Sequence, residues 1–305
     1  MVRFVGRSLL DSFIYVLAAI LTKQYMKKLI LIILLFSTIY CVAQDKLNFN
    51  TKFTQSEDKW VAFPADSLGS HIFGFIYIDS QAGLTFDYSG SFKINSNGKF
   101  ILKKKEMEGS IKHRLQPNNT LVAIIPESHF TELEVSKFPE WLKYYKEDEN
   151  TIERLYKWGY MYNGWGECAK ALEFLEKANK INPDYKGLRV ELGFSYNCLG
   201  QSQNAINILK AALKIEPKDA YIYKELLYSQ IHNNQLNDAI TTYDKIVAEI
   251  ADKTYNAENA YNILAGYFSQ KNLEKFNEWI KKTQIDKDKR FGHYVERLKK
   301  ELDKK

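Results

Sequence analysis

The sequence WGYMYNGWGECAKALEFLEKANKINP, from Trp158 to Pro183, is followed by LGFSYNCLGQSQNAINILKAALKIEP, from Leu192 to Pro217. The two stretches share one pattern. A period of about 34 residues within helical sequence indicates helix pairs stacked as a solenoid. Eight positions match between the stretches: Trp158 with Leu192, Gly159 with Gly193, Tyr162 with Tyr196, Gly166 with Gly200, Ala171 with Ala205, Leu175 with Leu209, Ala178 with Ala212, and Pro183 with Pro217.

This pattern resembles the tetratricopeptide repeat family, in which each repeat is a pair of antiparallel helices. The residue types have a physical reason. Gly159 and Gly193 suit close helix–helix contacts, where a larger side chain would force the pair apart. Pro183 and Pro217 end the second helix of their repeats, because proline lacks the N–H and its ring clashes with the preceding turn.

The pattern weakens toward the C-terminus. The resemblance covers residues 152–250 and fades beyond them. In the third repeat, Leu227 replaces the small residue and Ala251 stands where proline is expected. We therefore expect about four repeats within residues 151–290, the last two degenerate. A charged amphipathic helix within residues 291–305 then serves as the polar terminal cap that solenoids need.

The resemblance also implies a binding surface, since in this family the first helices of the repeats line a concave groove. Aromatic and asparagine side chains dominate the corresponding positions, and both types suit recognition of a peptide or protein. Three interpretations stay open: an external ligand, the chain's own sheet docked in the groove, or a packed aromatic stripe. The implied positions are Glu153, Tyr156, Tyr160, Asn163, Val190, Phe194, Asn197, Tyr221, Lys224, Tyr228, His232 and Asn262.

The sequence upstream of the repeats has a different period. From Lys59 to Pro126 it alternates with a period of two or forms short apolar runs between turn residues, which predicts strands. The turn sequence from Asn95 to Gly98 is typical of a hairpin. We predict a small antiparallel β-sheet domain over residues 44–126 and a helical connector over 127–150. The predicted fold class is α+β.

The N-terminus has the features of a secretory signal. Residues 26–43 combine a basic start at Met26, an apolar run and small residues before Gln44. That run is shorter than the roughly 20 residues that span a bilayer. We therefore expect cleavage, no stable membrane span in the mature protein, and a periplasmic or secreted location. Residues 1–25 are either a mis-assigned start or an additional hydrophobic segment.

Cleavage would leave two cysteines, Cys168 and Cys198. They fall on neighbouring antiparallel helices of the predicted solenoid. One interpretation is two separate small buried side chains, which we favour. The other is a disulfide between the first two repeats, because disulfides persist in exported proteins when the Cα atoms lie within roughly 7 Å.

Charge and motifs exclude several functions. The net charge is +6, of which residues 1–43 carry +4, and no basic cluster is interleaved with aromatics. Nucleic-acid binding is therefore not expected. The five histidines are scattered, so we expect no metal site, and no phosphate loop or nucleophile motif indicates a cofactor or catalytic residue.

The sequence thus predicts a non-catalytic protein–protein interaction or scaffold protein of the bacterial cell envelope. In this interpretation a peptide or protein partner binds in the groove of the repeats. The alternative is an envelope enzyme with its site in the β domain and the repeats as a docking arm. A deep polar pocket among residues 59–126 would favour the enzyme.

Overall fold

The computed structural model describes residues 46–106, 109–116 and 118–302. The predicted signal, residues 26–43, and the extension before it lie outside the described residues. The chain forms two units: Met1–Lys46 with Ser96–Gly98, and Leu47–Asn95 with Lys99–Lys305. The larger unit holds the sheet and the repeats, and it is described below. Among the described residues, no helix has the length and apolar content that a bilayer crossing requires.

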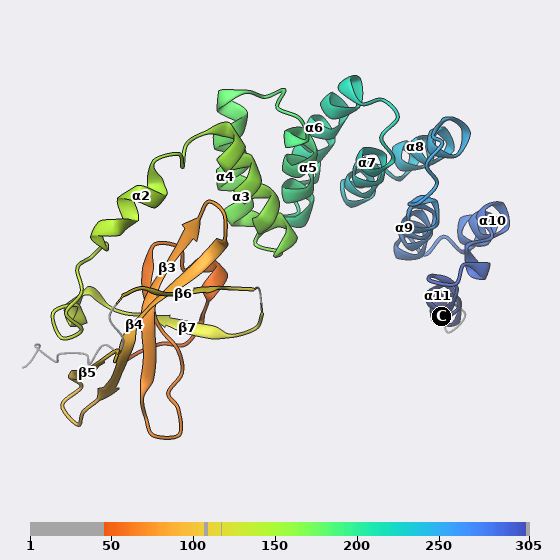
Figure 1. The fold of residues 1–305 in the computed structure, drawn as a ribbon. Helices are drawn as coiled ribbons and strands as arrows, with labels where there is room; N and C mark the ends of the chain where they lie inside the picture. The colour runs from red at the N-terminus through yellow and green to blue at the C-terminus, as the bar shows by residue number, and fades with distance from the viewer. Residues whose placement is uncertain (1–45, 107–108, 117, 303–305) are drawn as a thin grey trace, which may run out of the picture. The chain divides into compact units, whose positions relative to one another are not determined.

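The N-terminal part of this unit is an antiparallel sheet (Figure 1). The strand order is β1-β7-β2-β3-β4-β5, and β6 also pairs with β4. The long strand β4 is shared, because β6 pairs with its first half and β5 with its second half. The strands are β1 Thr51–Lys52, β2 Lys59–Ala62, β3 His71–Asp79, β4 Gly83–Ile94, β5 Phe100–Lys104, β6 Ile111–Arg114 and β7 Leu121–Ile124.

The predicted antiparallel sheet is confirmed, with one difference in its strands. The sequence pattern suggests separate strands over 84–88 and 91–94, but β4 runs through Gly90 without a break. A register shift lies in the neighbouring strand between Phe73 and Gly74. A Cβ on Gly74 would lie 2.2 Å from the carbonyl oxygen of Asp87, so only glycine fits this close approach of two strands.

Each face of the sheet has its own core. On one face, the aromatic side chains of β2 to β5, among them Trp60, Phe73 and Phe92, are buried. The segment after β7 covers this face with Leu142 and Trp141. Its short elements are η2 Glu127–His129, η3 Glu140–Leu142 and α2 Lys143–Lys146.

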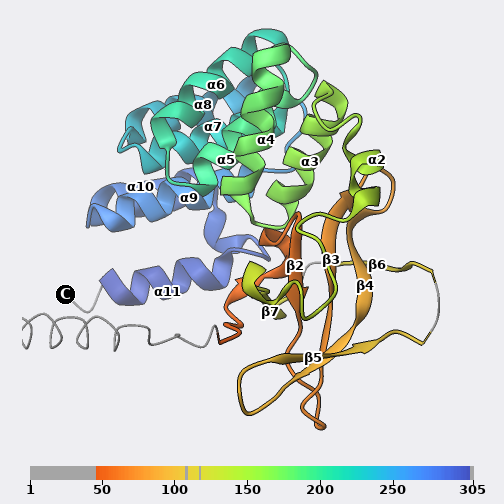
Figure 2. The ribbon, with the colours of Figure 1, turned by 90° about the vertical axis from the view of Figure 1, so that its left-hand side faces the viewer.

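The helical part follows as successive antiparallel hairpins (Figures 1 and 2). Each second helix packs on its own first helix and on the next repeat, and the first helices α3, α5, α7 and α9 contact one another in turn. The helices are α3 Ile152–Gly164, α4 Cys168–Ile181, α5 Leu188–Cys198, α6 Ser202–Ile215, α7 Ala220–His232, α8 Leu236–Glu249, α9 Asn256–Ser269, α10 Leu273–Thr283, η4 Ile285–Lys287 and α11 Gly292–Leu302.

The glycines of the repeat pattern have the expected packing role. A Cβ on Gly159 would lie 2.3 Å from Leu175, and one on Gly193 would lie 2.5 Å from Leu209. Both leucines belong to the second helix of the same repeat. The glycines therefore allow the two helices of each hairpin to approach closely.

The second face of the sheet shares a core with the first repeat. Apolar side chains such as Val61 and Ile78 cluster there with Leu155, Trp158 and Tyr162. Polar contacts surround this core: Arg154 Nη2 donates to the carbonyl of Ile78 (3.3 Å) and Lys157 Nζ donates to that of Ser80 (2.8 Å). The sheet thus covers the apolar end of the first repeat.

A buried carboxylate fixes the same junction. The Glu167 side chain, 8 % exposed, accepts hydrogen bonds from Lys52 Nζ (3.0 Å), Thr54 Oγ1 (3.0 Å) and Gln55 Nε2 (2.7 Å). Burial raises the pKa of Glu167, but these three hydrogen bonds outweigh it and hold the pKa below its usual value. Three donors from β1 and η1 are therefore tied to the start of α4.

Candidate partner-binding groove

The predicted groove residues lie on the first helices α3, α5, α7 and α9, which contact one another in sequence. They divide into two groups with different environments. Asn163 and Asn197 are buried between repeats. The aromatic residues, Lys224, His232 and Asn262 are half-buried or exposed.

The two asparagines do not face the groove, which corrects the prediction that they bind a ligand backbone. Asn163 is 4 % exposed, and its Nδ2 donates to both the carbonyl oxygen (3.0 Å) and Oε2 (2.9 Å) of Glu191. Its Oδ1 accepts from Ser195 Oγ (2.7 Å). All of these groups lie on the next first helix. Asn163 is therefore occupied in joining α3 to α5.

The same contacts recur one repeat later. Asn197, 8 % exposed, donates from Nδ2 to the carbonyl oxygen (3.1 Å) and Oε2 (2.9 Å) of Glu225, and its Oδ1 accepts from Ser229 Oγ (2.7 Å). The series ends there, because Ile231 occupies the next asparagine position and Asn259 the next glutamate position. The Asn–Glu–Ser recurrence at the repeat period is the sequence signal that would have predicted these contacts.

Replacing Asn197 with Ala is expected to lower the free energy of unfolding by about 1–3 kcal/mol. The change would remove one hydrogen-bond partner from each of the buried Glu225 and Ser229 side chains. Equilibrium urea unfolding followed by circular dichroism measures the effect. Asn207→Ala, which changes an exposed asparagine on α6, is the matched control and should shift stability by no more than about 0.5 kcal/mol. Equal stability of the two variants would contradict the interlocking role of Asn197.

Tyrosines form the beginning of the groove on α3. Tyr160 is 57 % exposed. The ring of Tyr156 packs on Tyr185, with 5.2 Å between ring centroids. The Tyr156 hydroxyl lies 2.5 Å from the place where a Cβ on Gly187 would be, so glycine at 187 makes room for it. Burial, and then the Glu191 carboxylate, raise the pKa of Tyr156.

Lys224 forms a charged cluster further along. Its Nζ lies 3.0 Å from Glu225 Oε1 and 3.5 Å from Glu258 Oε1, over the rings of Tyr221 (5.0 Å) and Tyr255 (5.6 Å). Burial alone would lower the pKa of Lys224, but the two carboxylates together raise it. The predicted pair Tyr221 and Lys224 is thus brought together by α7 and extended by α9.

The remaining predicted positions are less tightly held. Tyr228 stacks on His232, with 3.9 Å between centroids, and His232 Nδ1 lies 2.9 Å from the Tyr228 carbonyl oxygen. Phe194 and Asn262 are half-buried on α5 and α9. Together these side chains form an accessible surface with aromatic rings and polar groups on the later repeats.

Carboxylates change the predicted character of the groove, which we expected to be dominated by aromatic and asparagine side chains. Glu191, Glu225 and Glu258 were not among the predicted positions, yet they lie among its tyrosines. Burial raises the pKa of Glu191; the Asn163 hydrogen bond lowers it in part, and the Glu225 charge raises it further. The groove is therefore acidic as well as aromatic.

The sheet contacts another face of α3. Among the described residues, the contacts of the sheet with α3 involve the face that carries Trp158, Met161 and Leu155. Tyr160 on the same helix stays 57 % exposed. Of the three interpretations of the groove, docking of the chain's own sheet is the one that these contacts do not support.

Cys168 and Cys198 are joined by a disulfide in the structure, with 6.2 Å between the Cα atoms. Cys168 begins α4 and Cys198 ends α5, and these helix ends meet because the two helices pack as antiparallel neighbours. The structure therefore differs from the interpretation that we favoured, two separate side chains. The bond joins the first repeat to the second.

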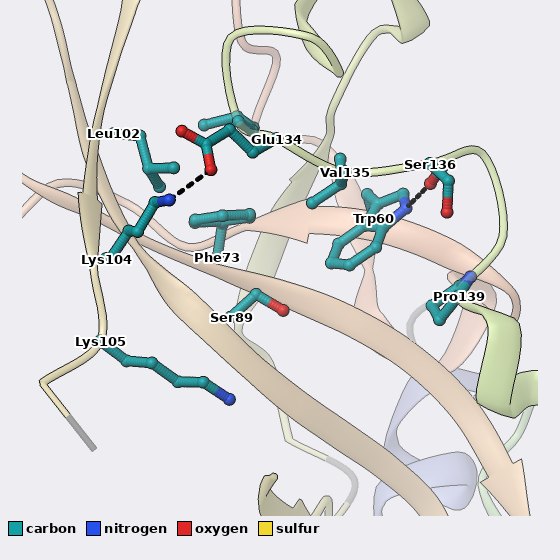
Figure 3. A pocket seen from close by; sticks show the side chains of 11 residues that line it. Trp60, Phe73, Ser89, Leu102, Lys104, Lys105, Glu134, Val135, Ser136 and Pro139 are labelled. Atoms are coloured by element: carbon teal, nitrogen blue, oxygen red, sulfur yellow. Dashed lines mark hydrogen bonds and ion pairs between the residues drawn. The ribbon is translucent and has the colours of Figure 1, made fainter. Parts of the chain in front are cut away.

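A cavity of about 470 Å³ lies on the aromatic face of the sheet (Figure 3). Trp60 and Phe73 form its buried floor. On its rim, the exposed Lys104 and Glu134 form an ion pair of 2.5 Å. Ser136 Oγ donates to a backbone carbonyl, that of Phe138 (2.7 Å). The lining combines apolar side chains with Ser89, Lys105 and this ion pair, and it includes no histidine or cysteine.

The described residues also contain no group of three or more histidine, cysteine, aspartate or glutamate side chains that could hold a metal ion.

Comparison with known proteins supports the helical part. The tetratricopeptide repeat family model matches residues 199–264. A comparison with curated proteins gives no match. Similar solved structures include MamA from Desulfovibrio magneticus RS-1, at 19% identity and a TM-score of 0.41, covering 47% of this chain and 80% of that one.

Two further solved structures are similar at the same level. A tetratricopeptide repeat protein from Parabacteroides merdae is 18% identical, with a TM-score of 0.38 over 57% of this chain and 67% of that one. A putative kinesin light chain from Podosopora anserina with nearly identical TPR-like repeats is 16% identical, with a TM-score of 0.37 over 44% and 74%. At these TM-scores the structural similarities support no conclusion about this chain.

The hairpins, their common period and the matched segment define a helical repeat domain of the kind that presents an extended surface to other proteins. The match over residues 199–264 supports the tetratricopeptide repeat family for this part of the chain. Domains of this family generally mediate protein–protein contacts and are generally non-catalytic.

Proposed function

We propose that this chain is a non-catalytic scaffold protein of the bacterial cell envelope, which binds an extended segment of a partner protein along the first helices of its repeats. The observation that carries the proposal is the row of accessible aromatic side chains on those helices, from Tyr160 to Tyr228. Such side chains give a large contact area at a small entropic cost, and they keep a polar tip for hydrogen bonding.

The envelope location rests on two features. Residues 26–43 have the pattern of a secretory signal, and the Cys168–Cys198 disulfide suits an oxidising compartment. The mature protein would then begin near Gln44. Intact-mass measurement of protein recovered from the periplasmic fraction tests this point, and a mass that includes residues 26–43 would contradict it.

The groove is tested by removing its two tyrosines together. Tyr160→Ala combined with Tyr228→Ala is expected to abolish partner recovery, because both rings leave the surface while the repeat cores stay intact. The measurement is affinity purification from envelope extract, quantified by mass spectrometry for the wild type and the double variant.

The control for this experiment is Tyr144→Ala. Tyr144 is 66 % exposed on α2, outside the first helices of the repeats, so this variant should recover the same partners as the wild type. Retained partners in the double variant would contradict the groove. A large loss of helical content or melting temperature would show instead that the two tyrosines are core residues.

A further inference from the structure

Lys224 shows how this groove holds a cation. Its ammonium group contacts Glu225 Oε1 and Glu258 Oε1, at 3.0 and 3.5 Å, and lies over the rings of Tyr221 and Tyr255. A carboxylate together with aromatic faces is a favourable environment for an ammonium or guanidinium group. Here the chain supplies the cation from its own α7.

The same carboxylate occurs one repeat earlier without a cation. Glu191 and Glu225 stand at matching positions of successive repeats, and both side chains accept the amide of an asparagine through Oε2. Oε1 of Glu225 pairs with Lys224. Among the described residues, Oε1 of Glu191 has no hydrogen-bond or ion-pair partner, and the side chain is only half-buried. The residue that corresponds to Lys224 is Val190, so the chain offers no ammonium there.

Two tyrosines lie near enough to Glu191 for its charge to act on them. After burial, the Glu191 charge helps to raise the pKa of Tyr156, and after burial and Glu225 it helps to raise the pKa of Tyr221. Tyr221 stands in the position that Tyr255 has in the next repeat. The second ring beside Lys224 is Tyr221. The matching position of the preceding repeat is Gly187, which has no ring. The hydroxyl of Tyr156 lies where the side chain of residue 187 would begin, and Tyr185 packs behind it. Tyr156, which lies on the preceding first helix α3, therefore supplies the ring that Gly187 lacks.

One difference between the two places is informative. The second carboxylate around Lys224 comes from Glu258. At the position of the preceding repeat that matches Glu258, the chain has a lysine, Lys224 itself. The earlier place therefore has a single contacting carboxylate, Glu191. The negative charge of Glu225 also acts on this place, because it contributes to raising the pKa of Glu191. One carboxylate with two tyrosines nearby matches one lysine or arginine side chain.

We infer that Glu191, Tyr156 and Tyr221 form a subsite for a lysine or arginine side chain of the partner segment. The inference rests on the proposed function, because it requires the partner to lie along these helices. It adds the chemistry of the partner: a basic residue that pairs with Oε1 of Glu191 as Lys224 pairs with Glu225. This subsite lies at the junction of the first three repeats.

The experiment uses the full mature chain and a library of random twelve-residue peptides displayed on phage. Peptides enriched on the wild type, and lost on the variant with Tyr160→Ala and Tyr228→Ala, are synthesised for fluorescence anisotropy. We expect these peptides to share a lysine or arginine. Its replacement by norleucine or citrulline should weaken binding to the wild type by about tenfold, the scale of one cation–aromatic and carboxylate contact.

The assignment to Glu191 is tested by a double-mutant cycle. Glu191→Gln keeps an oxygen for the Asn163 amide while it removes the charge, so the fold should persist. On this variant, the peptides with the basic residue and with its neutral replacement should bind about equally. Val190→Lys is also expected to weaken binding of the basic peptide by about tenfold. The introduced ammonium group would pair with Glu191 in place of the basic residue of the peptide. Val190→Met, a neutral change of similar length, is its control.

The outcomes separate the two proposals. Enriched peptides that depend on Tyr160 and Tyr228 but tolerate norleucine would overturn the cation subsite and leave the proposed groove standing. The neutral replacement in the peptide could instead weaken binding equally to the wild type and to Glu191→Gln. That result would show that the basic residue does not contact Glu191, and it would also overturn the inference. Absence of any groove-dependent peptide would contradict both proposals.

Discussion

Replacing Trp158 with Ala is expected to lower the free energy of unfolding by about 3–5 kcal/mol, the usual cost of removing a buried tryptophan from a core. Trp158 is 1 % exposed and belongs to the core that the sheet shares with the first repeat. Its ring lies close to Gly83 at the start of β4, where an added Cβ would be 3.9 Å away. The change therefore leaves a cavity between the two parts of the unit.

The effect should come from packing. The Trp158 Nε1 group has no hydrogen-bond partner among the described residues, so alanine removes apolar contacts without removing a hydrogen bond. Equilibrium urea unfolding followed by circular dichroism measures the loss. Tyr160→Ala is the matched control, because Tyr160 lies on the same helix and is 57 % exposed. We expect it to change stability by no more than about 0.5 kcal/mol. A loss below about 1 kcal/mol for Trp158→Ala would contradict the shared core.

Reduction of the Cys168–Cys198 disulfide is expected to lower the free energy of unfolding by about 3–4 kcal/mol. The bond closes a loop with a sequence separation of 30 residues between helices of successive repeats. In the chain-entropy account, closing such a loop restricts the unfolded chain and so favours the folded state. Unfolding of the mature protein with and without a thiol reductant measures the difference.

A variant that carries both Cys168→Ala and Cys198→Ala is the control for reduction. Its stability should match that of the reduced wild type to within about 1 kcal/mol, the loss of one buried sulfur atom, and it should not respond to the reductant. Thiol titration of the denatured, unreduced wild type gives an independent check. Two free thiols in that titration would rule out the bond.

The repeats could be predicted in detail because their pattern is local. Gly159 with Leu175 and Gly193 with Leu209 are contacts within one hairpin, and the repeat period fixes which residues meet. The same holds for the turn between β4 and β5, where the backbone N–H of Asn95 donates to the carbonyl of Lys99 (3.0 Å). Such contacts depend on a short stretch of chain, so residue type and spacing suffice to predict them.

The candidate groove was predicted in part. The aromatic positions and Lys224 lie on the first helices as expected, but Asn163 and Asn197 turn toward the next helix. The sequence assigns a residue to a helix, whereas the neighbouring helix decides whether its side chain meets protein or solvent. The carboxylates were missed for the same reason, because Glu191 and Glu225 belong to the groove only through the asparagines that hold them.

The sequence by itself determined the helical hairpins, the family of the repeats and the antiparallel sheet, because these depend on local periodicity and on glycine, proline and turn residues. Only the tertiary structure decided that the sheet covers the first repeat through Trp158 and Glu167 and that Cys168 meets Cys198. It also showed that Oε1 of Glu191 has no hydrogen-bond or ion-pair partner among the described residues. Those features join residues from separate elements, and their geometry is fixed by packing in three dimensions, which the spacing of residues along one chain does not specify.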